Sequence, residues 1–222
     1  MSKEHELIEA IRSGDAARTA ALLDEDPALL DARHGDASAL LLAVYTGKPQ
    51  IGRLFAERGK KLTFHEACAL GERETVRRMV EADPSLLHQY SSDGYAPLGF
   101  ATFFGHSDVD RFLLEQGAEV NAPARNPQRV SAVHAAAAVC DHSMLALLLE
   151  HGADPNAQQQ MDYTPMHTAA SRGDFDVARL LLRYGADPHA PGSDGKTPAT
   201  VARDHQQDAF AEWIESLPAA TT

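Results

Sequence analysis

The sequence has little of several features that would narrow its function. It holds two cysteines, Cys68 and Cys140, too few for the disulfide framework of a small secreted protein. Lys and Arg number 20 against 32 Asp and Glu, and the net charge of −12 disfavours nucleic acid binding, which needs clustered bases. No stretch reaches the roughly 18 consecutive apolar residues of a membrane span. We therefore expect no nucleic acid partner, no membrane partner and a cytoplasmic location.

Patterns for catalysis and metal binding are also missing. The chain has no Cys-x-x-Cys pair, no glycine-rich phosphate loop and no Gly-x-Ser-x-Gly sequence. His65-Glu66 begins like a zinc-protease motif, but the next histidine is His88, so the second ligand of that helix face is absent. Asp108 and Asp110 stand two residues apart on one predicted helix and so face apart. We predict no catalytic residue, no cofactor and no metal, and therefore no enzyme.

The most informative stretch runs from Tyr163 to Ala190 and reads YTPMHTAASRGDFDVARLLLRYGADPHA. Thr164 is suited to cap a helix with Pro165 at its first position. Gly173 is expected to end that helix in a left-handed conformation, and Asp174 to cap a second helix with an apolar stripe. Two short helices that are each apolar on one side cannot bury that surface alone, so the pattern predicts similar neighbours.

Copies of this stretch lie on either side of it. The glycine after the leucine run recurs at Gly117, Gly152 and Gly185, which are 35 and then 33 residues apart. The helix-opening proline recurs at Pro198, 33 residues after Pro165. A period of about 33 with an opening like Thr164-Pro165-Met166-His167 is typical of ankyrin repeats, and the chain closely resembles that family. The resemblance implies an all-α solenoid of about seven helix-turn-helix units with short β-hairpin fingers.

The repeats predict one domain over residues 1–222, because each unit packs on its neighbours. Gly47 and Gly71 are only 24 residues apart, so we expect the finger between units two and three to be missing. With an Asp-Pro-x-Leu-Leu segment on either side, this layout resembles bacterial ankyrin repeat domain-containing proteins. The finger at 123–129 has two extra residues and is expected to protrude further. The approximate units are 1–36 (N-terminal cap), 37–61, 62–94, 95–128, 129–161, 162–194 and 195–222 (C-terminal cap).

Three histidines occupy the fourth place of the helix-opening motif: His65, His134 and His167. The resemblance implies that such a histidine bonds to backbone groups of the opening turn and of the next unit. We interpret these residues as structural. Both cysteines are predicted to be buried in inner helices of different units.

The resemblance also implies that a partner binds to the concave side, which is formed by the fingers and by the residues just before each turn glycine. At these places the chain is apolar in the middle and polar at both ends. The predicted groove residues are Tyr45, Leu70, Phe103, Phe104, Val139 and Arg172, and the predicted finger contacts are Tyr95, Arg125, Arg129, Val130, Met161 and Tyr163. In an alternative interpretation, Phe103 or Phe104 is a core residue that fills the space of the missing finger.

These patterns favour a non-catalytic protein–protein interaction module that binds a partner through the concave groove. The alternative is an inhibitor or immunity-type protein that occludes one specific enzyme, for which an acidic surface suits a basic target. The partner is expected to be a folded protein or a peptide. We expect a monomer, with weak self-association through the apolar stripe as the alternative.

Overall fold

Most of the described helices begin at a capping side chain or a proline, and most end near a residue with left-handed backbone geometry. In helix α11 (Pro165–Arg172), Pro165 occupies the first turn and Gly173 follows with φ of 64°. Helix α12 (Phe175–Arg183) begins at Asp174, whose carboxylate accepts a hydrogen bond from the Val177 N–H at 3.0 Å. The predicted caps and the predicted left-handed glycine are therefore confirmed.

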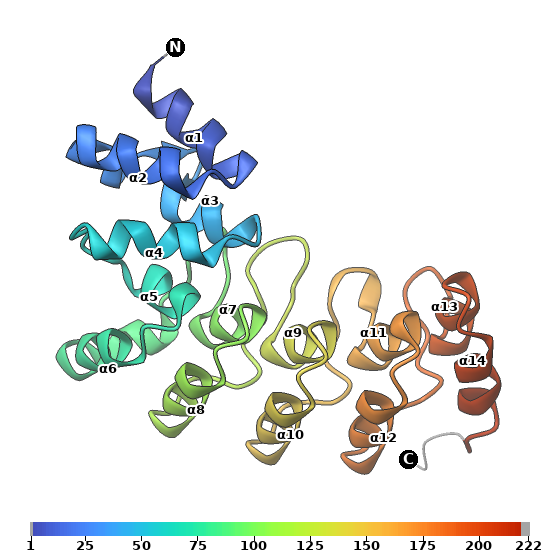
Figure 1. Cartoon of the computed structure of the whole chain (residues 1–222). Helices are drawn as coiled ribbons and strands as arrows, with labels where there is room; N and C mark the ends of the chain where they lie inside the picture. The colour runs from blue at the N-terminus through green and yellow to red at the C-terminus, as the bar shows by residue number, and fades with distance from the viewer. Residues whose placement is uncertain (1, 219–222) are drawn as a thin grey trace. The chain divides into compact units, whose positions relative to one another are not determined.

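The computed structural model describes residues 2–218. Within this range the chain forms fourteen α-helices, three 3-10 helices and two short strands (Figure 1). In chain order these are α1 (Lys3–Ser13), α2 (Ala16–Glu25), η1 (Pro27–Asp31), β1 (Arg33–His34), β2 (Ala37–Ser38), α3 (Ala39–Tyr45), α4 (Pro49–Glu57), α5 (Phe64–Leu70), α6 (Arg73–Ala82), η2 (Pro84–His88), α7 (Pro97–Phe103), α8 (Ser107–Glu115), α9 (Ala132–Ala138), α10 (His142–Glu150), η3 (Gln160–Asp162), α11, α12, α13 (Pro198–Asp204) and α14 (Asp208–Glu215). None of the described helices has the length and apolar character needed to cross a bilayer.

Two compact units divide the chain. The first runs to Leu86 and includes Ser91–Asp93, and the second comprises Leu87–Tyr90 and the chain from Gly94 onward. In the first unit the inner helices α1, α3 and α5 pack in succession, and each also packs on its outer partner, α2, α4 or α6. Helix α4 ends at Glu57 and α5 begins at Phe64, so no finger separates them, as the glycine spacing predicts. The single-domain assignment stays a prediction.

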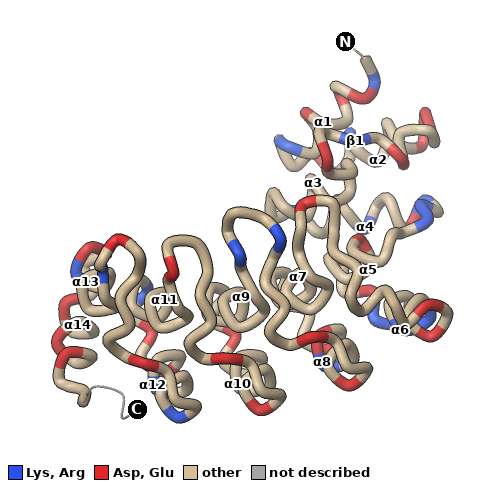
Figure 2. Tube along the Cα trace, turned by 180° about the vertical axis from the view of Figure 1, so that it is seen from behind, with Lys and Arg blue, Asp and Glu red and all other residues tan. Residues whose placement is uncertain are grey.

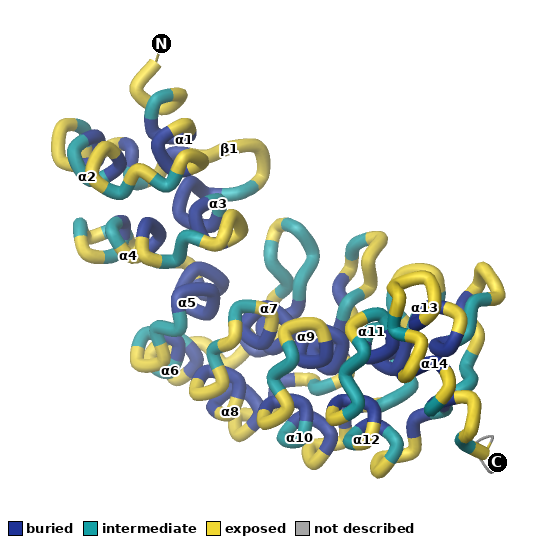
Figure 3. Tube along the Cα trace, turned by 45° about the vertical axis from the view of Figure 1, so that its right-hand side comes forward, coloured by how far each residue is buried: buried dark blue, intermediate teal, exposed yellow. Residues whose placement is uncertain are grey.

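The second unit repeats the helix pair in a regular row. Helices α7, α9, α11 and α13 pack side by side as the inner row, and α8, α10 and α12 pack as the outer row (Figure 1). Burial follows this arrangement, since the inner helices α9 and α11 are almost wholly buried, whereas the fingers between the helix pairs are half-buried or exposed (Figure 3). The core therefore runs between the two rows and leaves one edge of the inner helices open.

The fingers differ from the expectation of β-hairpins. Among the described residues, strands form only in the first finger, where Arg33 pairs with Ser38 and His34 with Ala37. The finger before α9 contains Pro123 and Pro127, which lack the N–H that a strand ladder needs. It extends further than the two fingers that follow it, as its two extra residues predict (Figure 1).

Cys140 corrects another expectation. It lies two residues beyond the end of α9, half-buried, with a left-handed φ of 55°. It therefore stands where Gly105 and Gly173 stand in neighbouring repeats, with φ of 75° and 64°. The prediction that it is buried in an inner helix is wrong, whereas Cys68 is buried within α5 as expected.

Two buried histidines connect the helix pairs of the second unit. The His134 Nδ1 bonds with the Ser131 hydroxyl at 2.8 Å, and its Nε2 bonds with the Ala157 carbonyl at 2.9 Å. His167 bonds in the same way with Thr164 at 3.0 Å and with the Lys196 carbonyl at 3.2 Å. The predicted structural role of these two rings is confirmed, because each connects a helix opening to the segment that leads to the next inner helix.

Two asparagines connect the turns that follow the outer helices. The Asn121 amide donates to the Gly152 carbonyl at 3.0 Å and accepts from the Asp154 N–H at 2.8 Å. One repeat later, the Asn156 amide makes the same pair of bonds with Gly185 and Asp187, at 2.9 and 2.8 Å. We call this series the asparagine ladder.

Candidate functional site

An aromatic cluster leads from the core of the second unit to its surface. The Phe100 ring is buried, and it meets Phe104 edge-on with centroids 5.2 Å apart. Phe104 is half-buried and meets Phe103 edge-on at 5.1 Å, and Phe103 is 49% exposed. Edge-to-face contacts of this kind stabilise the rings by about 0.5–1.5 kcal/mol beyond their burial. The exposed Phe103 ring is therefore held by Phe104, which in turn packs on the buried Phe100.

Val139 lies one repeat further on, just beyond the end of α9, and is exposed. Because α7 and α9 pack side by side, Phe103 and Val139 stand at corresponding ends of neighbouring inner helices. The sequence prediction of exposed apolar side chains at these two places is confirmed. Their role in binding stays a prediction.

Leu70 does not belong to an exposed stripe. It is 1% exposed, and its Cδ2 lies 3.1 Å from the point where a Cβ on Gly52 would stand. The missing side chain of Gly52 leaves room on α4 that Leu70 fills from α5. The prediction that Leu70 contacts a partner is therefore wrong. Tyr45, also in the first unit, is exposed, and its hydroxyl donates to the Asp93 carboxylate.

The predicted finger residues differ in how far they are already engaged. The Arg125 guanidinium lies 3.8 Å from the centroid of the Tyr90 ring, in a cation–π contact. Arg129 pairs with Asp162 on the next finger at 3.7 Å. Figure 2 shows Lys and Arg on both limbs of the finger that carries these two arginines. Among the described residues Arg125 forms no ion pair, whereas Arg129 already has a partner within the protein.

The other predicted finger residues also range from exposed side chains to side chains that contact other parts of the protein. Met161 is exposed with φ of 64°, and its carbonyl accepts from the Ser193 N–H at 2.8 Å. The Tyr163 ring stacks on His167 at 4.4 Å between centroids, and its hydroxyl donates to Asp194 at 3.0 Å. Tyr95 and Val130 are half-buried. Only Met161 among these four presents a large exposed apolar side chain.

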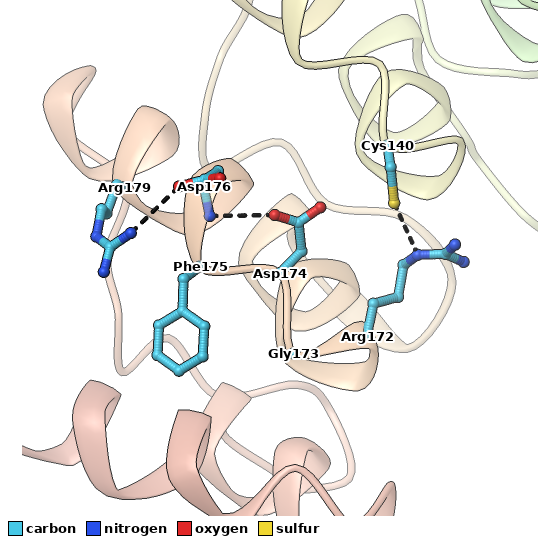
Figure 4. A pocket seen from close by; sticks show the side chains of 7 residues that line it. All are labelled: Cys140, Arg172, Gly173, Asp174, Phe175, Asp176 and Arg179. Carbon is cyan, nitrogen blue, oxygen red and sulfur yellow. Dashed lines mark hydrogen bonds and ion pairs between the residues drawn. The ribbon is translucent and has the colours of Figure 1, made fainter.

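Arg172 borders an open cavity of about 720 Å³ (Figure 4). Its Nε donates to the Cys140 Sγ at 3.0 Å, and the guanidinium points away from the other lining residues. Elsewhere in the cavity Arg179 pairs with Asp176 at 3.2 Å, and Asp174 caps α12 and bonds with the His142 Nε2 at 3.1 Å. These polar groups satisfy one another, so the cavity shows no reactive constellation.

The first unit contains a buried carboxylate with a full set of partners. Glu66 is 2% exposed, accepts from the Ser38 hydroxyl at 2.6 Å and accepts from the Thr63 N–H at 2.8 Å. Lys60, whose side chain is 6% exposed, places its Nζ 3.7 Å from Glu66 and 3.1 Å from Asp31. We call this arrangement the Glu66 network.

The second unit contains a buried carboxyl with few partners. Asp110 on α8 is 1% exposed, and its Oδ2 has no hydrogen-bond partner among the described residues. Its Oδ1 lies 3.1 Å from the Thr102 hydroxyl, which also lies 2.8 Å from the Leu98 carbonyl. One hydroxyl proton cannot serve both acceptors, so this geometry suits a protonated Asp110 that donates to Thr102.

The electrostatics of Asp110 agree with that geometry. Burial raises the pKa of the Asp110 carboxyl to about 8, the Thr102 hydroxyl opposes this rise, and the negative charges of Asp141 and Asp108 add to it. At the corresponding places in the next two repeats stand Leu145 and Ala178, both fully buried. Asp110 thus occupies a core position and lines neither of the two cavities that we describe.

No metal centre is evident within residues 2–218, where no group of three or more His, Cys, Asp or Glu side chains could hold an ion. Burial lowers the pKa of His134 to about 4, so the ring is neutral near pH 7 and acts as a hydrogen-bonding group. Tyr184, which is 40% exposed at the end of α12, was not anticipated from the sequence, because it stands beyond the leucine stripe of an outer helix.

The geometry defines the class of protein: a solenoid of helix pairs joined by fingers, with exposed apolar side chains on its inner helices. Comparison with known protein families then identifies the type of repeat. The family model described as "Ankyrin repeats (many copies)" matches residues 148–202, and the model described as "Ankyrin repeat" matches residues 93–125 and 130–159. Residues 93–125 and 130–202 therefore consist of ankyrin repeats, as the sequence resemblance predicts. Ankyrin repeats generally serve as non-catalytic protein–protein interaction modules.

Curated proteins from several eukaryotes are similar to parts of the chain. Human ankyrin repeat and KH domain-containing protein 1 is 31% identical over 109 residues, which is 49% of this chain and 4% of that protein. The serine/threonine-protein kinase VIK of Arabidopsis thaliana is 34% identical over 90 residues, covering 40% of this chain and 20% of the kinase. BTB/POZ domain-containing protein 3 of Schizosaccharomyces pombe is 42% identical over 57 residues, covering 26% and 11%. The chain therefore spans a small part of each of these relatives.

Proposed function

We propose that the chain binds a protein partner through the exposed edge of the inner helices of its second unit and catalyses no reaction of its own. The observation that carries the proposal is the Phe103 ring, which is 49% exposed and makes an edge-on contact with the Phe104 ring. An exposed aromatic side chain that is already ordered loses little conformational freedom on binding. Aromatic anchors of this kind contribute about 2 kcal/mol or more at interfaces.

Val139 on the neighbouring repeat and Met161 on a finger supply further exposed apolar surface to this proposal. Arg125 adds a positive charge in a protein of net charge −12, and it would orient an acidic region of the partner. Two free cysteines accord with the cytoplasmic location that we include in the proposal. Occlusion of one basic enzyme by this acidic protein is a narrower form of the same function.

The proposal is tested by comparing three proteins in affinity capture from the source organism, followed by mass spectrometry. Phe103→Ala is expected to lose the partner that the unchanged protein retains, with a loss of about 30-fold in affinity. Tyr184→Ala is the matched control, because it removes an aromatic side chain of similar exposure from an outer helix. Retention of the same partners by Phe103→Ala, or equal losses in both variants, would contradict the proposal.

Thermal unfolding of the same variants separates binding from packing. Phe103→Ala should lower stability by only about 1–2 kcal/mol, because half of the ring is in solvent and the substitution removes one edge-on contact with Phe104. Phe104→Ala is expected to destabilise more, because Phe104 contacts both Phe100 and Phe103. A large loss of stability in Phe103→Ala would support the alternative that this ring is a core residue. A single enzyme as the captured protein would favour the inhibitor form of the proposal.

A further inference from the structure

A second cavity of the second unit lies where the asparagine ladder begins. It has a volume of about 150 Å³ and lies between the segment at 87–90, the start of α7 and the turn after α8. Its floor is apolar and buried, formed by Leu87, Leu98 and the small side chains of Ala118 and Ala122. The exposed side chains of His88, Glu119 and Arg125 lie at its rim. A cavity of about this volume accommodates one benzene-sized group.

The turn beside this cavity lacks the bonds that the following two turns receive. Gly152 and Asp154 are bonded by Asn121, and Gly185 and Asp187 are bonded by Asn156. Gly117 and Glu119 occupy the same two places in the turn after α8. Within residues 2–218 no side-chain amide reaches the Gly117 carbonyl or the Glu119 N–H. The first rung of the ladder is therefore open.

The charged side chains at the rim of the cavity indicate which ligand charge the site prefers. The Arg125 guanidinium lies over the Tyr90 ring, and none of the described carboxylates forms an ion pair with it. A guanidinium without an ion-pair partner can donate hydrogen bonds to a carboxylate of another molecule. Glu119 and His88 are also at the rim, so the preference for an acidic neighbour is modest.

We propose that this cavity binds an extended peptide segment of another protein, in which an aliphatic side chain fills the cavity and an adjacent asparagine completes the ladder. The asparagine amide donates to the Gly117 carbonyl and accepts from the Glu119 N–H, as Asn121 and Asn156 do one and two repeats further on. Acidic residues beside this pair meet Arg125. The site goes beyond the proposed function, because none of the apolar residues of that surface lines it.

The test is a nuclear magnetic resonance titration of the full chain with the capped peptide Ac-Glu-Leu-Asn-Glu-NH2, which follows backbone amide signals. We expect saturable shifts of the Glu119 and Ala122 amides with a dissociation constant of about 1 mM or lower. Replacing Leu by Ala in the peptide empties the cavity and should weaken binding about tenfold. Replacing Asn by Asp removes the donor to Gly117 and should weaken it by about the same factor. These comparisons use the unchanged protein and do not depend on a variant that folds.

Two protein variants locate the site. Ala122→Leu fills the cavity and is expected to abolish the shifts, whereas Ala157→Leu, at the same place one repeat later, is the matched control and should leave them unchanged. The proposal is overturned if the first peptide leaves the Glu119 amide unmoved, if the Ala or Asp peptide binds equally well, or if Ala157→Leu removes binding as Ala122→Leu does. Equal or tighter binding of a peptide with Lys in place of both Glu residues overturns the acidic preference. Phe103→Ala should bind the peptide normally, so failure of this site and failure of the proposed function are distinguishable.

Discussion

Among residues 2–218, each of the two units buries one carboxyl side chain, and the two units stabilise these groups in opposite ways. In the first unit Glu66 keeps a hydroxyl, a backbone N–H and the Lys60 ammonium group close to its oxygens. In the second unit Asp110 has one contact at 3.1 Å and an oxygen without a partner among the described residues. Burial of an ionised carboxyl is unfavourable unless it is paired and hydrogen-bonded. The first unit therefore stabilises an ionised carboxylate with hydrogen bonds and an ion pair, whereas the geometry and the raised pKa of Asp110 favour the protonated carboxyl in the second unit.

The largest expected effect comes from removing the acid of the Glu66 network. Glu66→Ala leaves the Lys60 ammonium group, whose side chain is 6% exposed, with Asp31 as its remaining ion-pair partner among the described residues. Breaking a buried ion pair from one side destabilises by about 3–5 kcal/mol. Denaturant unfolding should show a loss of this size for Glu66→Ala and a smaller one for Glu66→Gln, which keeps an acceptor for Ser38. Equal stability of Glu66→Ala and the unchanged protein would show that the network does not stabilise the first unit.

An intermediate effect is expected when the proton of Asp110 is removed. Because burial raises the folded-state pKa from 3.8 to about 8, the folded protein binds more protons than the unfolded chain between these two values. Stability therefore falls as pH rises through this window, by about 1.4 kcal/mol per pH unit, and becomes level above about pH 8. Between pH 6.5 and 8 the unchanged protein should lose about 2 kcal/mol relative to Asp110→Asn, as measured by denaturant unfolding.

Below pH 6.5 the titration of a buried histidine opposes that of Asp110. Burial lowers the pKa of His134 from 6.5 to about 4, so this ring makes stability rise with pH between those values, opposite to Asp110. Parallel pH profiles for the unchanged protein and Asp110→Asn above pH 6.5 would mean that Asp110 is ionised in the folded state near neutral pH.

The smallest effect is expected from making the second unit apolar at this position. Asp110→Val replaces a carboxyl that lacks a partner by a side chain like those at corresponding places, where Val76, Leu145 and Ala178 are fully buried. We expect a gain of about 1 kcal/mol at pH 7 in denaturant unfolding, since removal of an unsatisfied polar group from a core is neutral to stabilising. Glu66→Val should instead destabilise, and the same sign for both substitutions would remove the contrast between the units.

The repeat period predicted the helix pairs, their caps and the missing finger, because these depend on local residues such as Thr164, Pro165 and Gly173. The exposure of Phe103 and Val139 followed from the same period. Leu70 was misplaced because its burial depends on Gly52, a contact between helices that no local pattern contains. Cys140 was misplaced for a related reason. The sequence does not show that a cysteine, and not a glycine, occupies the left-handed turn position after α9.

The charged groups were the least predictable part. No local pattern indicates that Asp110 and Glu66 are buried, because tertiary packing alone decides their burial and which atoms face them. The open rung at Gly117 and Glu119 likewise depends on the absence of an asparagine in the preceding segment at the right place in space. A period of 33 residues identifies such a position only after the turns have been stacked.

The imidazole bridges of His134 and His167 have a consequence for how the second unit melts. Each ring belongs to one inner helix and bonds to a carbonyl of the segment that leads to the next inner helix. When a helix pair frays, a buried imidazole nitrogen of the pair before it therefore loses its hydrogen-bond partner. Unfolding that begins at α13 thereby destabilises the helix pair of α11, and then that of α9. The helix pairs from α9 onward are expected to exchange their amide hydrogens as one cooperative block rather than as a graded series.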